Sequence, residues 1–308
     1  MSKTILITGA TSGIGRHAAL HLAKRGHRVF ATGRNGAQLA LLADEAKGHA
    51  LETLELDVTS ARSIAAAKAE VDRRTDGRGV DVLINNAGYG LWAPMELVTD
   101  DDLRKQFDTN VFGLMAVTRA FVPAMRDRGD GRVLNVSSVG GRITLPFGGA
   151  YNATKYALES MSDALRLELA PFGVRVVLIE PGLIRTEFAA RTMGLLAKYR
   201  EEPSAYTGVL DKARDMEKQL DGLNVGPEHI SRAITRAVEA RRPSARYVAP
   251  WRTYAALWFM KAMPTSFVDW VLRRASGLTR QNLLASPKVA PVSDRPPAGA
   301  AEQPHAAA

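Results

Sequence analysis

TGATSGIG, residues 8–15, decides how the rest of the chain is interpreted. It follows a short β-branched and apolar run at 4–8 and opens a stretch of helical periodicity at 13–25, which Gly26 ends. A glycine-rich turn between strand and helix lets the backbone approach an anion, and the free N–H groups of the helix start attract its charge. The turn therefore predicts a nucleotide site, although a plain strand-to-helix turn also uses glycine.

The same alternation of strand and helix continues along most of the chain. The expected strands are 4–8, 28–32, 51–57, 80–85, 132–137, 174–179 and 245–249, and the expected helices are 13–25, 36–47, 60–74, 100–128, 150–170 and 227–241. Continuous apolar runs such as VRVVLI are typical of strands buried on both faces. The pattern predicts an α/β fold of the Rossmann type, with one doubly wound parallel sheet of about seven strands and helices on both faces.

The bulk composition excludes several classes of protein. With no Cys among 308 residues, disulfides and thiolate metal sites are ruled out, and we expect no metal at the site. The net charge of +9 is not gathered into a basic block interleaved with aromatics, so we expect no nucleic-acid partner. The N-terminus does not resemble a signal peptide, and no uncharged apolar run approaches the roughly 20 residues that span a bilayer. A cytoplasmic location is the expectation.

The chain changes character after about residue 180. We expect a single catalytic domain over 1–283, in which 186–225 forms a lid over the substrate. Residues 250–280 are aromatic and basic and are expected to be helical. Residues 284–308 are rich in Pro and Ala and poor in large apolar residues, which predicts a disordered tail.

The end of the second expected strand indicates which dinucleotide binds. An NAD site usually has an acidic residue here for the ribose hydroxyl, whereas this chain has Gly33 and then Arg34. A guanidinium can hold a 2′-phosphate through two hydrogen bonds, so NADP(H) is favoured over NAD(H), unless Arg34 is only a solvated surface residue. Asp57 ends the third strand, where its carboxylate could contact the adenine amino group or serve a helix start. The glycine turn would contribute Gly9, Thr11, Ser12, Gly13, Ile14 and Gly15.

YNATK, residues 151–155, places a tyrosine and a lysine one helical turn apart on the same helix face. An ammonium beside a phenol stabilises the phenolate. Moving the pKa of a phenol from about 10 to about 7 requires roughly 4 kcal/mol, and a unit charge at about 4 Å in an effective dielectric near 20 supplies about that much. We therefore expect Lys155 to lower the pKa of Tyr151, so that the phenol can exchange a proton near neutral pH.

Several further motifs stand in order along the chain: LDVTS, NNAG at 85–88, Asn110, NVSSVGG at 135–141 and PG at 181–182. Together with the glycine turn and YNATK they resemble the short-chain dehydrogenase/reductase family over about residues 3–250. Within the family, the stretches LETLELDV, GLWAPME, GRVLNVSSVGGRITLPFGGAYNATKYALE and LAPFGVRV resemble the 17β-hydroxysteroid and retinol dehydrogenase branch. The resemblance implies a catalytic tetrad of Asn110, Ser138, Tyr151 and Lys155. Ser138 is chosen over Ser137 because it lies 13 positions before Tyr151, the family spacing.

The resemblance also implies a role for each member of the tetrad. Tyr151 would exchange the proton, and Ser138 would stabilise charge on the carbonyl oxygen. Lys155 would bind the nicotinamide ribose, and Asn110 would hold a water. The remaining cofactor contacts by analogy are Val58, Asn86, Ala87, Gly88, Pro181, Gly182, Ile184 and Thr186.

The expected activity is hydride transfer between NADP(H) and a lipophilic ketone or secondary alcohol, steroid-like or retinoid-like. A largely apolar substrate pocket is expected from the segment after Pro181 together with Tyr89, Leu91, Trp92, Ile143, Leu145 and Phe147. A 3-oxoacyl thioester reductase would use the same tetrad, and a dinucleotide-sensing regulator without turnover is the alternative from another class.

Two further expectations concern partners. The family suggests a homodimer or homotetramer formed through the helices at 100–128 and 150–170. Residues 241–274 contain seven basic groups and one acidic group, with five Trp and Phe interleaved. That surface could rest on an anionic membrane over 250–274; alternatively, the aromatics cover the substrate site or a subunit contact.

Overall fold

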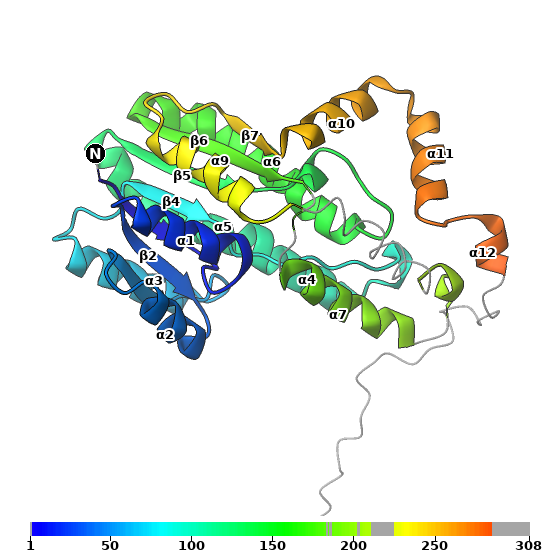
Figure 1. The fold of residues 1–308 in the computed structure, drawn as a ribbon, viewed down its shortest axis with the longest axis horizontal. Helices are drawn as coiled ribbons and strands as arrows, with labels where there is room; N and C mark the ends of the chain where they lie inside the picture. The colour runs from blue at the N-terminus through cyan, green and yellow to red at the C-terminus, as the bar shows by residue number, and fades with distance from the viewer. Residues whose placement is uncertain (1, 183, 185–186, 202–203, 211–224, 285–308) are drawn as a thin grey trace, which may run out of the picture.

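The computed structural model describes residues 2–182, 184, 187–201, 204–210 and 225–284. Within these residues a seven-stranded sheet has the order β3-β2-β1-β4-β5-β6-β7, and every neighbouring pair is parallel (Figure 1). The strands are β1 (Thr4–Ile7), β2 (Arg28–Gly33), β3 (Leu51–Glu55), β4 (Val82–Asn85), β5 (Gly131–Val136), β6 (Val174–Pro181) and β7 (Arg246–Ala249). The order reverses between β1 and β4, which confirms the doubly wound fold expected from the sequence.

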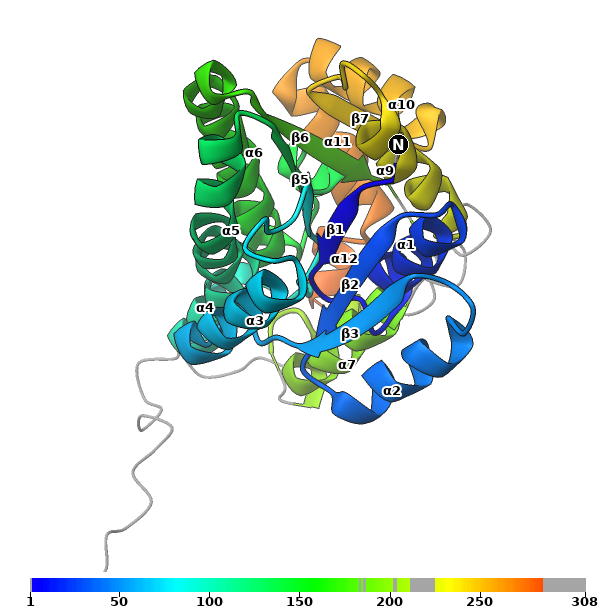
Figure 2. The ribbon, with the colours of Figure 1, turned by 90° about the vertical axis from the view of Figure 1, so that its left-hand side faces the viewer.

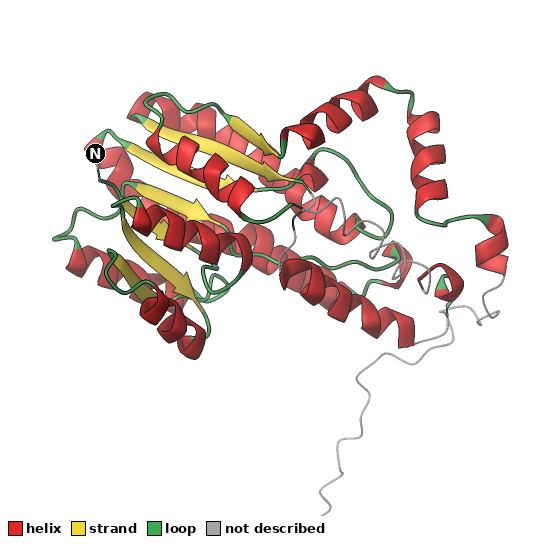
Figure 3. Cartoon of the chain, viewed as in Figure 1, coloured by secondary structure: helices red, strands yellow, loops and turns green. Residues whose placement is uncertain are grey.

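Helices cover both faces of the sheet, as Figure 2 shows: α1, α2 and α9 lie on one side, and α3, α5 and α6 on the other. Figure 3 distinguishes these layers from the connecting loops. The helices are α1 (Gly13–Lys24), α2 (Gly36–Glu45), α3 (Ala61–Arg74), α4 (Asp100–Phe107), α5 (Leu114–Arg128), α6 (Gly149–Leu169), α7 (Glu187–Glu201), α9 (Glu228–Glu239), α10 (Trp251–Ala262), α11 (Thr265–Ala275) and α12 (Arg280–Leu284).

The two faces of the sheet carry separate apolar cores. Ile5, Ile7 and Val29 face α1 and α9, whereas Leu6, Phe30 and Leu83 face α3 and α5. Alternate residues of one strand thus enter opposite cores, which is why the central strands read as unbroken apolar runs. Each buried Leu, Ile or Phe stabilises the fold by about 1.5–3 kcal/mol relative to exposure.

Side-chain caps help to explain where several helices begin. Asn35 accepts a hydrogen bond from the backbone N–H of Gln38 before α2, and Ser60 accepts one from Ser63 before α3. Thr99 caps α4, whose first turn is also acidic and so complements the positive helix start. Such caps contribute about 0.5–2 kcal/mol each.

The helix predicted over 100–128 is interrupted. After α4 the chain makes a π-helical turn, η2 (Asp108–Gly113), before it continues as α5. Hydrophobic periodicity does not distinguish a π-turn from an α-turn, because one wider turn shifts the pattern by a single residue. Such turns are rare and occur frequently at functional sites.

The C-terminal helices α10 and α11 stand away from the sheet beyond β7 (Figure 1). The sequence predicted helices within 250–280, and α10 and α11 lie there. The expected lid contains the described helix α7, but much of it, including 211–224, and the expected tail after Leu284 lie outside the described residues.

Candidate active site

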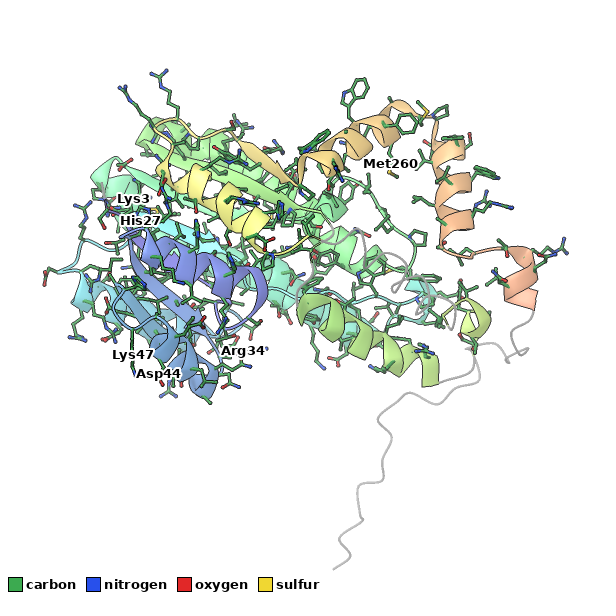
Figure 4. The ribbon with its side chains drawn as sticks, viewed as in Figure 1. Lys3, His27, Arg34, Asp44, Lys47 and Met260 are labelled. Carbon is green, nitrogen blue, oxygen red and sulfur yellow. The ribbon has the colours of Figure 1, made fainter. Side chains whose placement is uncertain are left out.

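The predicted site residues collect at one edge of the sheet, because the carboxyl ends of parallel strands share an edge. The turn after β1, Arg34 after β2, Asn86 after β4, Ser138 after β5 and Pro181 at the end of β6 all occupy this edge. Figure 4 shows Arg34 there, whereas Lys3 and His27 mark the opposite end of β1 and β2.

The glycine turn leaves no room for a side chain at Gly9 or at Gly15. Gly9 has a φ of +66°, and a Cβ added to it would lie 2.8 Å from the Ala87 Cα. A Cβ added to Gly15 would lie 2.3 Å from the Gly9 carbonyl oxygen and 2.4 Å from Asn86 Nδ2. Both contacts involve backbone that cannot move aside, so larger residues would push the turn open.

Asn86 holds this turn in shape. Its Nδ2 donates to the carbonyl oxygens of Thr8 and Gly9, at 3.0 Å each. The backbone N–H groups of Asn86 and Ala87 donate to Thr8 Oγ1 at 2.9 and 3.0 Å. The sequence did not single out Thr8, although its place at the start of the turn after β1 was a usable signal.

The surroundings of Arg34 suit an external anion. The residue is exposed, and no ion pair with its guanidinium is found within the described ranges. A Cβ on Gly33 would lie 2.6 Å from Thr11 Cγ2, so the Arg34 segment packs directly against the glycine turn. Arg16, by contrast, pairs with Glu45.

Asp57 has a local use. Its Oδ1 accepts hydrogen bonds from the backbone N–H and the hydroxyl of Thr59, at 2.9 and 2.8 Å. Its own backbone N–H donates to Ser63 Oγ in the first turn of α3. The carboxylate therefore shapes the turn before α3, whereas the helix cap itself is Ser60. The contact of Asp57 with the adenine amino group stays a prediction.

Tyr151 and Ser138 meet at the start of α6. Tyr151 is buried, and the Ser138 hydroxyl lies close enough to lower the pKa of its phenol. A Cβ on Gly140 would lie 3.4 Å from both Ser138 Oγ and Tyr151 Cε1. Ser138 Oγ also accepts from the Gly140 backbone N–H at 3.0 Å, which fixes the hydroxyl beside the phenol. Among the described residues, the buried hydroxyl of the adjacent Ser137 has no hydrogen-bond partner and is not placed against Tyr151 by any contact.

Lys155 lies one turn after Tyr151, as the spacing predicted. Its Nζ is 5.7 Å from the centroid of the Tyr151 ring and donates to the Val136 carbonyl at 2.8 Å. Burial lowers the pKa of Lys155 to about 8, and the charge of Glu159 opposes this effect.

The expected lowering of the tyrosine pKa is wrong for this structure. Burial raises the pKa of Tyr151 to about 12, and the hydrogen bond with Ser138 only partly offsets it. Removing water from a phenolate disfavours its charged form, and this outweighs what Ser138 returns. The simple Coulomb argument omitted this desolvation.

Asn110 lies in the π-turn η2 and is buried. Its Oδ1 accepts from the Tyr89 backbone N–H at 3.1 Å, and its Nδ2 donates to the Tyr89 carbonyl and to Thr154 Oγ1 at 2.9 and 3.1 Å. Because both amide hydrogens are used, the side chain ties the segment after β4 to α6.

The remaining residues predicted to contact the cofactor lie in different surroundings. Val58 is buried against Gly113, while a Cβ on Gly88 would lie 3.0 Å from Asn110 Oδ1. A Cβ on Gly182 would lie 2.4 Å from Thr253 Oγ1, so the turn after Pro181 packs on α10. Ile184 forms an isolated parallel bridge with Val225. Thr186 lies outside the described residues.

The expected pocket is only partly assembled from the residues proposed for it. Leu91 is 2% exposed and belongs to a small core with Ala93, Ala150 and Tyr199, so its assignment to the pocket lining is wrong. Phe147 has a φ of +65°, which is unusual for a bulky side chain, and its ring meets that of Tyr206 edge to face. Strain of this kind is often kept at ligand sites.

Phe188 was not predicted, although it lies two residues beyond Thr186 in the expected lid. Its ring centroid is 5.6 Å from that of Tyr151. Helix α7, which carries it, is attached to α4 because Lys198 Nζ and the Tyr199 hydroxyl both donate to Asp102 Oδ2. The Phe188 ring therefore packs next to Tyr151, the predicted proton donor.

The chain is similar in sequence to proteins of known family. The family model described as "short chain dehydrogenase" matches residues 3–193. Human 17-beta-hydroxysteroid dehydrogenase type 1 is 37% identical over 258 residues, which is 80% of this chain and 77% of that protein. Human retinol dehydrogenase 16 is 36% identical over 283 residues, 88% of this chain and 87% of that protein.

A solved structure has the same fold. The closed form of serine dehydrogenase complexed with NADP+ superimposes with a TM-score of 0.68 at 31% identity, covering 80% of this chain and 93% of the other. Another similar structure, 3-ketoacyl-(acyl-carrier-protein) reductase from Brucella melitensis, is complexed with NADH. The fold, the motifs and these matches together place the chain in the short-chain dehydrogenase/reductase family of oxidoreductases, close to its 17β-hydroxysteroid and retinol dehydrogenase branch.

Proposed function

We propose that this protein uses NADP(H) to interconvert a bulky lipophilic ketone and its secondary alcohol. The observation that carries the proposal is the junction of Ser138, Tyr151 and Lys155 beneath the ring of Phe188. A hydroxyl pair that can hold a carbonyl oxygen, with an ammonium next to it, suits polarised C=O chemistry.

Two observations indicate that the glycine turn fits a dinucleotide cofactor. Gly9 and Gly15 leave a cradle that any Cβ would fill, and Ser12 at the start of α1 makes no side-chain cap bond to the first N–H groups of the helix. Residues 9–15 would hold the diphosphate and Arg34 the 2′-phosphate, while Lys155 would hold the nicotinamide ribose. When bound, the cofactor supplies or accepts the hydride.

The roles of the side chains follow from their positions. Tyr151 donates a proton to the carbonyl oxygen during reduction, and Ser138 hydrogen-bonds the same oxygen. Lys155 supplies a positive charge one turn away. Asn110 acts as a positioning residue through its bonds to the Tyr89 backbone and Thr154.

The protonation states favour the reductive direction. With its pKa raised to about 12, Tyr151 keeps its proton at neutral pH and is ready to give it away. Oxidation of an alcohol would require the phenolate, whose burial is costly. Reduction should also weaken as the pH rises through about 8, where Lys155 loses its charge.

The aromatic surroundings support a lipophilic substrate. Phe147, Phe188 and Tyr206 stand near the start of α6, whereas Arg142 is committed to Glu180. A long-chain acyl thioester would need an unpaired arginine near Tyr151 to bind its charged end, and none of the contacts within the described residues places one there.

Turnover with NADPH over hydrophobic ketones of graded size tests the proposal. Tight NADPH binding without reduction of any ketone would instead favour a dinucleotide sensor.

Self-association is the expected assembly. Phe112, Tyr156 and Leu167, on η2 and α6, are 58%, 43% and 67% exposed. Apolar side chains gathered on exposed helix faces favour a subunit contact. We expect sedimentation velocity at micromolar concentration to show a dimer or tetramer, and Leu167→Glu to shift it toward monomer; a wild-type monomer would refute the proposal.

The C-terminal helices offer a surface for an anionic membrane. Trp251, Trp258, Phe259, Phe267 and Trp270 are between 44% and 73% exposed. Arg252, Lys261, Arg273 and Arg274 are interleaved with them along the sequence, where the one acidic residue of α10 and α11 is Asp269. In the described part of the chain no helix is long and apolar enough to cross a bilayer. Contact would therefore be peripheral, with aromatics at the headgroups and basic groups attracting anionic lipid.

Vesicle binding tests this surface. We expect binding to phosphatidylserine-rich vesicles, little binding to pure phosphatidylcholine, and release by salt. Replacing both Trp258 and Trp270 with Ala should weaken binding at least about tenfold, since each buries a large ring. Leu41→Ser, an exposed apolar change on α2, serves as the matched control. Equal binding by all variants would exclude this surface.

A further inference from the structure

A cluster of acidic and arginine side chains, of which Glu159 and Glu180 are buried, begins one helical turn after Lys155. The proposed chemistry has given it no role. Glu159 lies one turn after Lys155 on α6, and its Oε2 is 3.2 Å from Arg246 Nη2. Arg246 also pairs with Asp163 at 2.6 Å and with Glu180 Oε1 at 3.1 Å. Arg142 donates to the same Glu180 oxygen at 3.1 Å. We call these five residues the acid–arginine cluster.

Two carboxylate oxygens of the cluster remain unsatisfied within the described structure. Glu159 Oε1 and Glu180 Oε2 are buried and have no hydrogen-bond partner there. Glu159 is 6% exposed and Glu180 is fully buried. A buried carboxylate without a full set of donors is costly, so its negative charge must be offset by nearby cations.

Lys155 is placed to be one of those cations. It is buried, and within the described part of the chain its ammonium hydrogen-bonds to a neutral group, the Val136 carbonyl. The Gly141 backbone presses on both residues: a Cβ there would lie 2.9 Å from Glu159 Cγ and 2.9 Å from the Lys155 carbonyl oxygen. The segment that carries Ser138 thus packs against the Lys155–Glu159 turn of the helix.

We propose that Glu159 is a positioning residue whose carboxylate keeps Lys155 in its ammonium form at neutral pH. This inference rests on the proposed function, because it gives a role to the charge of Lys155. The Lys155 ammonium lies beside the ring of Tyr151, and Glu159 follows one helical turn later on the same buried face of α6. Glu159 in turn faces Glu180 from β6, Arg246 from β7 and Arg142 from the loop after β5, with Asp163 next along α6 and partly exposed.

The alternative role for Glu159 is a structural brace that only anchors Arg246 and the edge strand β7. The two roles differ in what they do to Lys155. A brace affects stability and leaves the protonation of Lys155 unchanged, whereas a positioning residue sets the pH at which the lysine loses its charge. Titration of Lys155 itself separates them.

The test is an NMR titration of the full-length protein with 15N- and 13C-labelled lysine, with the Lys155 signal assigned through Lys155→Met. We expect a wild-type midpoint at about 8. In Glu159→Gln the midpoint should fall by at least about one pH unit. Glu159→Asp, which keeps the charge, should restore it. Asp127→Asn should leave it at the wild-type value, because Asp127 is an exposed carboxylate outside the acid–arginine cluster. The affinity for NADPH, measured across the same pH range, should follow the Lys155 midpoint in every variant.

Arg246→Gln gives a second test with the opposite sign, and it applies even if Glu159→Gln does not fold. Removing the guanidinium leaves the Glu159 charge less neutralised, so the Lys155 midpoint should rise. An unchanged midpoint in Glu159→Gln, or an unchanged or lower one in Arg246→Gln, would overturn the proposal and leave the brace. Neither measurement uses a ketone substrate. A protein that fails to reduce ketones can therefore still confirm or contradict the role of Glu159.

Discussion

Tyr151→Phe is expected to reduce kcat for ketone reduction by at least about 10³-fold while leaving NADPH affinity within about threefold. The change removes one hydroxyl and keeps the ring, so packing against Phe188 and the contact with Lys155 survive. Ser138 retains its bond from the Gly140 N–H and can still hold a carbonyl oxygen. The variant loses only the hydroxyl proton that Tyr151 would donate to the carbonyl oxygen.

Tyr156→Phe is the matched control, because Tyr156 lies on the same helix five residues later and is 43% exposed. It should keep wild-type turnover. Thermal unfolding of both variants should stay within about 1 kcal/mol of wild type, the usual net value of one hydrogen bond. If Tyr151→Phe keeps more than a tenth of the activity, another group donates the proton and the assignment of Tyr151 is wrong.

The sheet and most of the site could be predicted because they depend on local patterns. Apolar runs, glycine turns and the spacing of Ser138, Tyr151 and Lys155 are all visible in the chain, and parallel strands necessarily bring their carboxyl ends together. The cap residues Asn35 and Ser60 likewise stand at the helix starts they stabilise.

Features that depend on burial and on distant contacts could not be predicted. The raised pKa of Tyr151 reflects how much protein encloses the phenol, which spacing does not reveal. Leu91 looked like a pocket residue but packs beneath α7, since an apolar side chain serves either purpose. Glu159 meets Arg246, 87 residues away, across a helix and the edge strand.

Arg34→Asp is expected to lower the ratio of catalytic efficiencies with NADPH and NADH by at least about 10²-fold. Two effects add: the variant loses a charge-assisted pair of hydrogen bonds worth about 1.5–3 kcal/mol, and it places a carboxylate where a 2′-phosphate would lie. Arg34 can respond to an external anion, because no described acidic group already neutralises it. The preference for NADPH in the wild type should also weaken with added salt.

Three comparisons locate the effect. Arg34→Ala removes the attraction without adding repulsion, so its ratio should fall between those of wild type and Arg34→Asp. Arg16→Ala should change the ratio by less than about threefold, because Arg16 is already paired with Glu45. Equal losses with both cofactors would mean that Arg34 supports the turn rather than the phosphate. An unchanged ratio would place the 2′-phosphate elsewhere, since a cation that discriminates between the two cofactors must act on the one group by which they differ.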